Sequence, residues 1–276
     1  MEDKTKKKNS FDYDLQKIDA KHNLWRIEND LDWIFSYGKI EKNIDTKISL
    51  YWLDINLKNI FFPWILKIER ELKSYFVYLF KIKFNNDLSN LVNPLNYKKT
   101  SFDKNPIDIW KNVDFKQAKT IDELIFSLTF GEFINFFITF NSYFRITISS
   151  KINLKEAVFI SYLKCILILR NAVAHNKTVI KIKDEKNNKR FSLKKASFDF
   201  EISKQEIDII STNVSGSIFV IKKLLLHFDS PAKAKSFISE IQKGFAKFQK
   251  EINNPINYLK IIKLLFLNYF QQILKI

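Results

Sequence analysis

Three polar side chains that could do chemistry together close an apolar stretch of the chain, LKCILILRNAVAHNK, residues 163–177. They are Arg170, Asn171 and, four residues further on, His175. Arginine is always charged and histidine titrates near neutral pH, so the pair suits charge stabilisation and proton transfer at an anchored position. Asn171 and His175 would share one face of a helix, where the amide can orient the imidazole.

Arg170 and His175 point in different directions on a regular helix. Five residues correspond to about 140° around the axis and about 7.5 Å along it. Arg170 therefore reaches the same cleft only if the helix end loosens or if a second subunit closes the site. The spacing by itself says little, because a chain with five Arg and three His produces such a match by chance on the order of one time in seven.

The elements that must position these residues are predicted to be helices. With only 4 Gly and 5 Pro, the chain has few residues that interrupt long helices. Apolar residues recur at helical spacing over residues 15–37, 49–84 and 121–140, with a break or kink expected at Pro63. Residues 85–118 are predicted to be a loop region with short helical pieces.

The helix that carries the three polar residues is predicted over residues 154–175. Asn153 is its expected N-cap, and Glu156 would complete a loose capping box. After it, alternating apolar and polar residues around the turn-forming DEKNNK predict a basic β-hairpin over residues 178–203.

The remaining chain, residues 204–276, returns to helical spacing in two or three helices, one of which starts at Ser230-Pro231. Residues 1–10 are expected to be a basic disordered tail. We therefore expect one domain: a helical body over residues 11–177, the hairpin, and C-terminal helices packed on the same body.

The charge of the chain favours a polyanionic partner. The net charge is +16 and the pI about 9.6, which makes nucleic acid the default expectation. The alternative is codon bias in an AT-rich genome, because Lys, Asn, Ile and Phe are all abundant; on charge alone the two explanations are evenly matched.

The single cysteine, Cys165, excludes an intrachain disulfide and a zinc cluster built on cysteines. A reducing, cytoplasmic environment fits this, and the first residues contain no secretory signal. The C-terminal stretch YLKIIKLLFLNYFQQILKI is interrupted by Lys, Asn and Gln. It is predicted to be a core helix rather than a membrane-surface helix.

RNAVAH, residues 170–175, resembles the Arg-Asn-x-x-x-His motif of HEPN ribonucleases. Two further stretches are similar to helices of the Abi-like proteins of bacterial abortive infection: ISLYWLDINLKNIFFPWILKIEREL, residues 48–72, and LIFSLTFGEF, residues 124–133. The resemblance runs from about residue 24 to 177. It departs from some HEPN toxins at Lys177, where those toxins carry a tyrosine that can be modified by AMP.

The resemblance implies a HEPN-like antiparallel helical bundle. Together with the small β-hairpin insertion and the extra C-terminal helices that the residue pattern predicts outside the resemblance, it makes the expected protein mainly α-helical. The resemblance also implies a metal-independent endoribonuclease without a cofactor, in which the RNA 2′-OH attacks the adjacent phosphorus. His175 would be the general acid and base, Arg170 would stabilise the charge on the phosphoryl oxygens, and Asn171 would position the reacting groups. One motif per chain predicts a two-fold homodimer with a composite cleft.

RNA is the expected partner, as substrate and as a structured noncoding RNA of the kind paired with some Abi-like relatives; no membrane partner is expected. Two alternatives stay open. In one, the protein is a non-catalytic RNA-binding scaffold in which Arg170 and Asn171 only cap the helix end. In the other, it is a toxin that uses its C-terminal helix at a membrane surface.

The remaining candidates each have a structural alternative. Glu69 could support the active site or form an ion pair on its own helix, and Asp54 could fix the bundle or touch RNA. His22 and His227 have no partner pattern. A last group, at and after the motif, could bind phosphates or only protect an edge strand by charge: Lys177, Lys181, Lys183, Arg190, Lys194 and Lys195.

Overall fold

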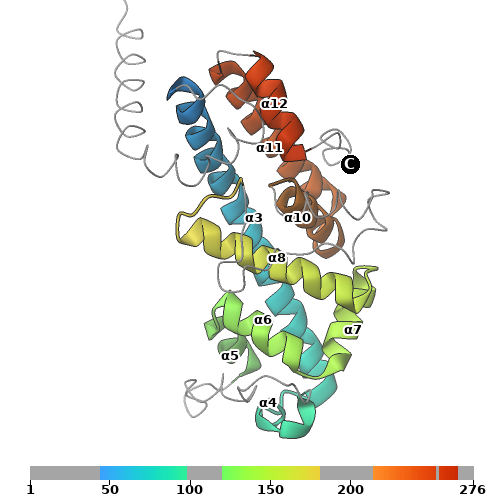
Figure 1. Ribbon diagram of the computed structural model, residues 1–276. Helices are drawn as coiled ribbons and strands as arrows, with labels where there is room; N and C mark the ends of the chain where they lie inside the picture. Colours follow the sequence, from blue (N-terminus) through green and yellow to red (C-terminus); the bar gives the residue numbers. More distant parts are fainter. Residues whose placement is uncertain (1–43, 98–119, 181–213, 253–254, 267–276) are drawn as a thin grey trace, which may run out of the picture.

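The computed structural model describes residues 44–97, 120–180, 214–252 and 255–266 (Figure 1). This part of the chain is helical and contains no named strand, only an isolated antiparallel bridge between Tyr97 and Phe140, so the predicted mainly α class is confirmed for it. The elements are α3 (Ile44–Phe84), α4 (Ser89–Val92), the 3-10 helix η1 (Pro94–Asn96), α5 (Ile121–Ser127), α6 (Phe130–Thr139), α7 (Ser142–Lys151), α8 (Glu156–Ala174), α10 (Val214–Phe228), α11 (Pro231–Glu251) and α12 (Pro255–Phe266).

Helix α3 is the axis on which the other elements are assembled. It has 41 residues, about 60 Å at the rise of an α-helix. Helices α10 and α11 pack on it toward one end, α5 and α7 toward the other, and α8 crosses between them (Figure 1). Of the break or kink expected at Pro63, the break does not occur, since α3 continues through it. Phe61, Trp64 and Ile65 around it are buried in the core, and this packing compensates for the one helical hydrogen bond that proline removes.

The C-terminal half of α3 is embedded in phenylalanine. Phe76 lies 4.8 Å from Phe144 and 5.3 Å from Phe136, measured between ring centroids, and Phe136 lies 4.8 Å from Phe140. These tilted and edge-on contacts are the arrangements that aromatic rings prefer. The abundance of Phe thus builds one shared core for α3, α6 and α7.

The prediction of a single helix over residues 121–140 is wrong in one respect, because this segment forms two helices, α5 and α6. Leu128 is extended, and Thr129 then caps α6 through a capping box with Glu132. The buried Lys73 ammonium donates to the Leu128 carbonyl at 2.7 Å, which fixes the corner. The short pieces expected after residue 84 are confirmed as α4 and η1.

The predicted N-cap of α8 is also wrong, and α7 was not predicted. Asn153 has a left-handed backbone (φ 52°) and ends α7, since the N–H groups of Asn153 and Leu154 bond back to Ser150 and Ser149. Helix α8 begins at Glu156 instead. Glu156 is thus the first helical residue and not the third, which a capping box requires; its Oε1 accepts from the fully buried Arg145 at 2.6 Å.

The start of α11 at Ser230-Pro231 is confirmed: the Ser230 hydroxyl accepts from the Lys233 N–H. Of the C-terminal stretch predicted to be a core helix, the described part lies in α12, where the side chains of Ile261 and Leu265 are fully buried; residues 267–276 lie outside the described residues. Of the predicted hairpin, residues 178–180 are described and contain bends instead of a strand. Its remainder, 181–203, lies outside the described residues, as do the tail 1–10 and the helical pattern over 15–37.

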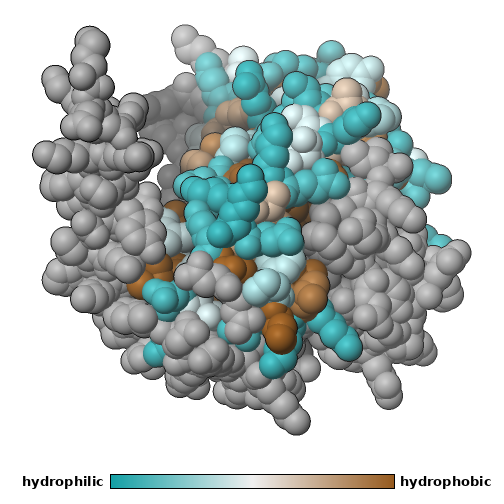
Figure 2. Space-filling view, turned by 90° about the horizontal axis from the view of Figure 1, so that it is seen from above, coloured by the Kyte–Doolittle hydropathy of each residue, from teal (hydrophilic) through white to brown (hydrophobic). Residues whose placement is uncertain are grey.

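Among the described helices, α8 is long and apolar enough to cross a membrane, and 44% of its apolar window is buried inside the protein. A core helix of a folded domain meets the same criteria, and α8 packs against α3, α6, α7 and α10. Seen from above, the described surface is largely hydrophilic and is interrupted by small hydrophobic patches (Figure 2).

Candidate active site at the end of α8

The three polar residues of the motif lie at the C-terminal end of α8. Asn171 is in its last turn, Arg170 comes immediately before that turn and His175 is its C-cap. The helix stops because Asn176 has a left-handed backbone, with φ 51°. The Asn176 N–H then bonds to the Val173 carbonyl at 3.1 Å and the Lys177 N–H to the Ala172 carbonyl at 2.7 Å. This Schellman arrangement satisfies the Ala172 and Val173 carbonyls with backbone groups alone.

The side chains of the motif are therefore not used to cap the helix. Asn171 and His175 are exposed and Arg170 is half-buried. Within the described ranges, none of the three side chains makes a hydrogen bond or an ion pair, and the buried Nε of Arg170 has no partner. Asn171 and His175 are joined through the backbone, by the His175 N–H and the Asn171 carbonyl at 3.0 Å, so the role of Asn171 in orienting the imidazole stays a prediction.

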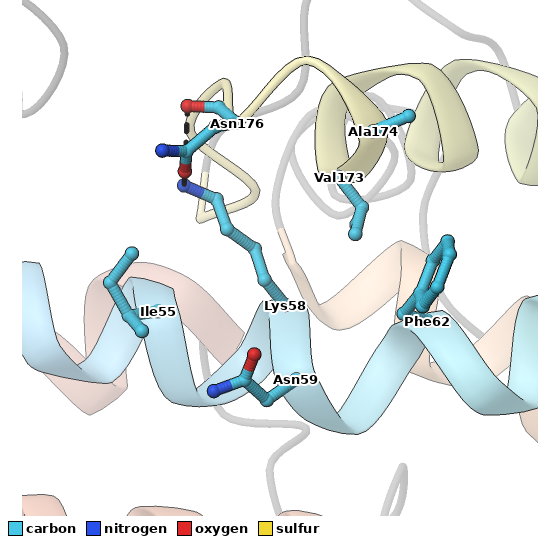
Figure 3. Close-up of a pocket in the computed structure, with 7 residues that line it drawn as sticks. All are labelled: Ile55, Lys58, Asn59, Phe62, Val173, Ala174 and Asn176. Carbon is cyan, nitrogen blue, oxygen red and sulfur yellow. Dashed lines mark hydrogen bonds between the residues drawn. The ribbon is translucent and has the colours of Figure 1, made fainter.

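Two buried charges on α3 fix the chain that follows the motif. Asp54 Oδ1 accepts from the N–H groups of Val179 and Ile180 at 2.8 and 3.1 Å. Asp54 Oδ2 pairs with Lys58 Nζ at 2.6 Å, and Lys58 in turn donates to Asn176 Oδ1 at 3.0 Å (Figure 3). The end of α8 is thus tied to α3 immediately after His175.

The Asp54 carboxylate has no capacity left for RNA. Asp54 and Lys58 are 4% and 8% exposed, and burial raises the pKa of the Asp54 carboxyl, against the lowering effect of Lys58 and of the two backbone hydrogen bonds. Of the two roles considered for Asp54, the structure gives it the one of fixing the bundle. Its partner Lys58, and Asn176 to which Lys58 donates, were not singled out from the sequence. The signal was an Asp and a Lys four residues apart within the apolar stripe of α3.

A cavity of about 320 Å³ opens between α3 and α8 beside this anchor (Figure 3). Ala174 and Asn176, the two chain neighbours of His175, both line it. Arg170 lies three and four residues before Val173 and Ala174, which places it one turn along the same stripe of α8. The complete lining is Ile55, Lys58, Asn59, Phe62, Val173, Ala174 and Asn176.

The family model described as "Abi-like protein" matches residues 36–181, more than half of the chain. The chain belongs to the Abi-like protein family. Comparisons with curated proteins and with solved structures found no match. The Abi-like match covers α3 through α8, and hence both the motif and its anchor, whereas α10, α11 and α12 lie beyond it. Membership of this family points to abortive infection, a form of phage defence.

Glu69 lies elsewhere in the Abi-like region. Its Oε1 pairs with Lys73 Nζ at 2.8 Å, and Lys73 binds the Leu128 carbonyl at the corner between α5 and α6. Glu69 is eleven residues beyond Lys58, about 16 Å along α3. Among the described residues it makes no hydrogen bond or ion pair with the motif. The contact that it does make is the alternative considered for it, an ion pair on its own helix.

The remaining candidates are placed only in part. Lys177 is exposed two residues after His175, and His227 is in the last turn of α10, as expected of a helix-end histidine. The described residues contain no group of three or more His, Cys, Asp or Glu side chains that could hold a metal ion. Candidates outside the described residues are His22, Lys181, Lys183, Arg190, Lys194 and Lys195.

Proposed function

We propose that this Abi-like protein is a metal-independent endoribonuclease of the HEPN type that acts in abortive infection. The observation that carries the proposal is the state of the motif: Arg170, Asn171 and His175 lie together at a helix end that is fixed from outside, and within the described part of the chain their side chains have no structural partner. The buried Arg145, in contrast, is paired with Glu156.

The chemistry follows from these side chains and from RNA itself. The 2′-oxygen of a ribose bonds to the adjacent phosphorus and the bond from phosphorus to the 5′-oxygen breaks, which leaves a cyclic phosphate and a free 5′-hydroxyl. His175 transfers the protons of this exchange. Arg170 stabilises the negative charge that grows on the phosphoryl oxygens, and Asn171 positions the reacting groups.

The fixed helix end supports this role better than a capping role. The capping alternative required the side chains of Arg170 and Asn171 to satisfy the last carbonyls of α8. Those carbonyls that the turn covers are satisfied by the backbone N–H groups of His175, Asn176 and Lys177. Rigid placement of the backbone beside a catalytic group is what keeps reacting atoms in alignment.

The test is cleavage of labelled RNA in the presence of EDTA. His175→Ala and Arg170→Ala are each expected to reduce the cleavage rate by at least about 100-fold, the usual contribution of such groups, while RNA binding is retained. His227→Ala, at the end of α10, and Arg70→Ala, exposed on α3, are matched controls that should cut normally. A His175→Ala protein that cuts at the wild-type rate contradicts the proposal, and a wild type that binds RNA without cutting it supports the scaffold alternative.

The proposed site is shared by two copies of the chain, because Arg170 and His175 diverge by about 140° on one helix. Mixed dimers of the Arg170→Ala and His175→Ala proteins can contain one cleft with an intact Arg and an intact His. Mixing the two inactive variants should therefore restore part of the activity. A monomer at micromolar concentration with undiminished cleavage contradicts the dimer.

A structured noncoding RNA is the proposed partner, in keeping with the net charge of +16. Purification at moderate salt followed by absorbance at 260 nm and sequencing should recover one discrete RNA species. Binding should weaken steeply with salt, because phosphate contacts release counterions. A heterogeneous mixture of RNA fragments would contradict a specific partner.

A further inference from the structure

The cavity beside the motif has one aromatic wall. Phe62 of α3 is 41% exposed, although its neighbour Phe61 is fully buried, and its ring stands at the space between α3 and α8, toward which Val173 also points (Figure 3). A large apolar ring at the mouth of an open cavity presents a flat surface to a ligand. At about 320 Å³, the cavity is within the range of small-ligand sites.

The polar groups of the cavity are of two kinds. Lys58 is already neutralised by Asp54 and donates to Asn176, so the cavity offers no uncommitted cation for a phosphate. Asn59 is exposed, and its side-chain amide makes no hydrogen bond within the described part of the chain. The Asn59 carbonyl also lacks its usual helical donor, because the residue four positions on is Pro63.

We infer that this cavity is a nucleobase subsite: it holds one unstacked base of single-stranded RNA beside the bond that is cut. The inference rests on the proposed function. Phe62 supplies the stacking surface, and the Asn59 amide supplies one donor group and one acceptor to the edge of the base. Neither residue is part of the motif.

The charges around the cavity suit the base and the phosphate of one nucleotide at two different places. Arg170 lies one turn along α8 from Val173 and Ala174, which line the cavity, and its guanidinium suits a phosphate. A nucleotide with its base against Phe62 thus brings its phosphate toward Arg170 of the same chain. The aromatic cavity, whose one lysine is already paired with Asp54, and the unpaired Arg170 beside it match the two parts of one nucleotide.

The experiment uses full-length protein carrying His175→Ala, so that RNA is bound without being cut, and oligonucleotides that contain one 2-aminopurine at successive positions. Stacking on an aromatic side chain quenches this fluorophore. We expect quenching at one position, its loss in Phe62→Ala and its retention in Phe62→Trp. Affinity should fall by about 5- to 150-fold in Phe62→Ala, the effect of removing one stacking contact.

The preference for a particular base is read in the cleavage-competent protein. Asn59→Asp keeps the size of the side chain but removes its donors, so we expect the base preference next to the cut to change. The matched controls are Phe126→Ala, whose ring is 46% exposed on α5, and Asn135→Asp, exposed on α6. Both should bind and cut as the wild type does.

Two results would overturn the subsite while leaving the ribonuclease intact. In one, Phe62→Ala and Asn59→Asp cut RNA with unchanged KM and unchanged base preference. In the other, Phe62→Ala separates the dimer without changing base preference, which would assign the ring to a contact between subunits. Failure of the ribonuclease proposal is recognised separately, by undiminished cleavage in His175→Ala.

Discussion

Replacing Asp54 tests whether the anchor on α3 holds the end of α8. Asp54→Ala removes the partner of the buried Lys58 ammonium and the acceptor of two buried N–H groups, those of Val179 and Ile180. Breaking a buried ion pair from one side destabilises a protein by about 3–5 kcal/mol, and each unsatisfied buried donor adds about 1–3 kcal/mol. Because these groups share one network, the effects do not add fully.

We therefore expect Asp54→Ala to lower the free energy of unfolding by about 3–5 kcal/mol, a large share of the stability of a typical domain. Asp54→Asn should be milder, because its amide oxygen still accepts from the backbone. The assay is urea unfolding followed by circular dichroism. The matched control is Asp122→Asn, whose pair with Lys81 is 45% and 47% exposed, and it should lose no more than about 1 kcal/mol.

The same substitution has a functional consequence under conditions where the variant stays folded. Since Lys58 would lose its fixed position, its bond to Asn176 Oδ1 would weaken and the backbone beside His175 would gain freedom. RNA cleavage should then fall more than RNA binding. If the free energy of unfolding of Asp54→Ala lies within about 1 kcal/mol of the wild-type value and the variant cuts RNA normally, Asp54 does not anchor the end of α8.

Three further predictions concern other parts of the fold. Burial raises the pKa of the Cys165 thiol from 9.0 to about 12, so the folded protein keeps a proton that the unfolded chain loses; urea unfolding should therefore show stability falling more steeply above pH 9 in wild type than in Cys165→Ala. Gly131→Ala should stabilise α6 by about 0.5–1 kcal/mol, because the added carbon meets Leu167 at an ordinary 3.6 Å; Gly244→Ala should melt lower than Gly131→Ala, since its new carbon lies 3.0 Å from the Asn56 amide nitrogen. Asn176→Ala should lower the melting temperature more than Asn176→Gly, because alanine is strained at φ 51° and glycine is not.

The elements that the sequence predicted well are those set by local periodicity. The apolar stripe of α3 and the cap at Ser230 were visible because their signals lie within a few residues. The predicted helix boundaries were wrong where a distant side chain contacted a residue that the prediction had used as a cap. Asn153 and Glu156 matched a capping box, yet Glu156 Oε1 pairs with Arg145, and Asn153 ends the preceding helix.

The composition of the chain also made its helix ends difficult to predict. Every described non-glycine residue with a positive φ is an asparagine: Asn85, Asn86, Asn153 and Asn176. Asparagine tolerates this backbone because its short amide can bond locally. In a chain with 4 glycines it takes the place of the usual helix terminator, but its abundance elsewhere keeps the sequence from showing which copies do so.

The sequence by itself determined the helical class, the aromatic core and the motif of Arg170, Asn171 and His175, because these depend on residue type and spacing along one segment. Only the tertiary structure decided what holds that motif. Asp54 and Lys58 meet the chain after His175 across more than a hundred residues, since α8 crosses α3 at this point. Such a contact depends on how two helices pack, and neither helix carries that information alone.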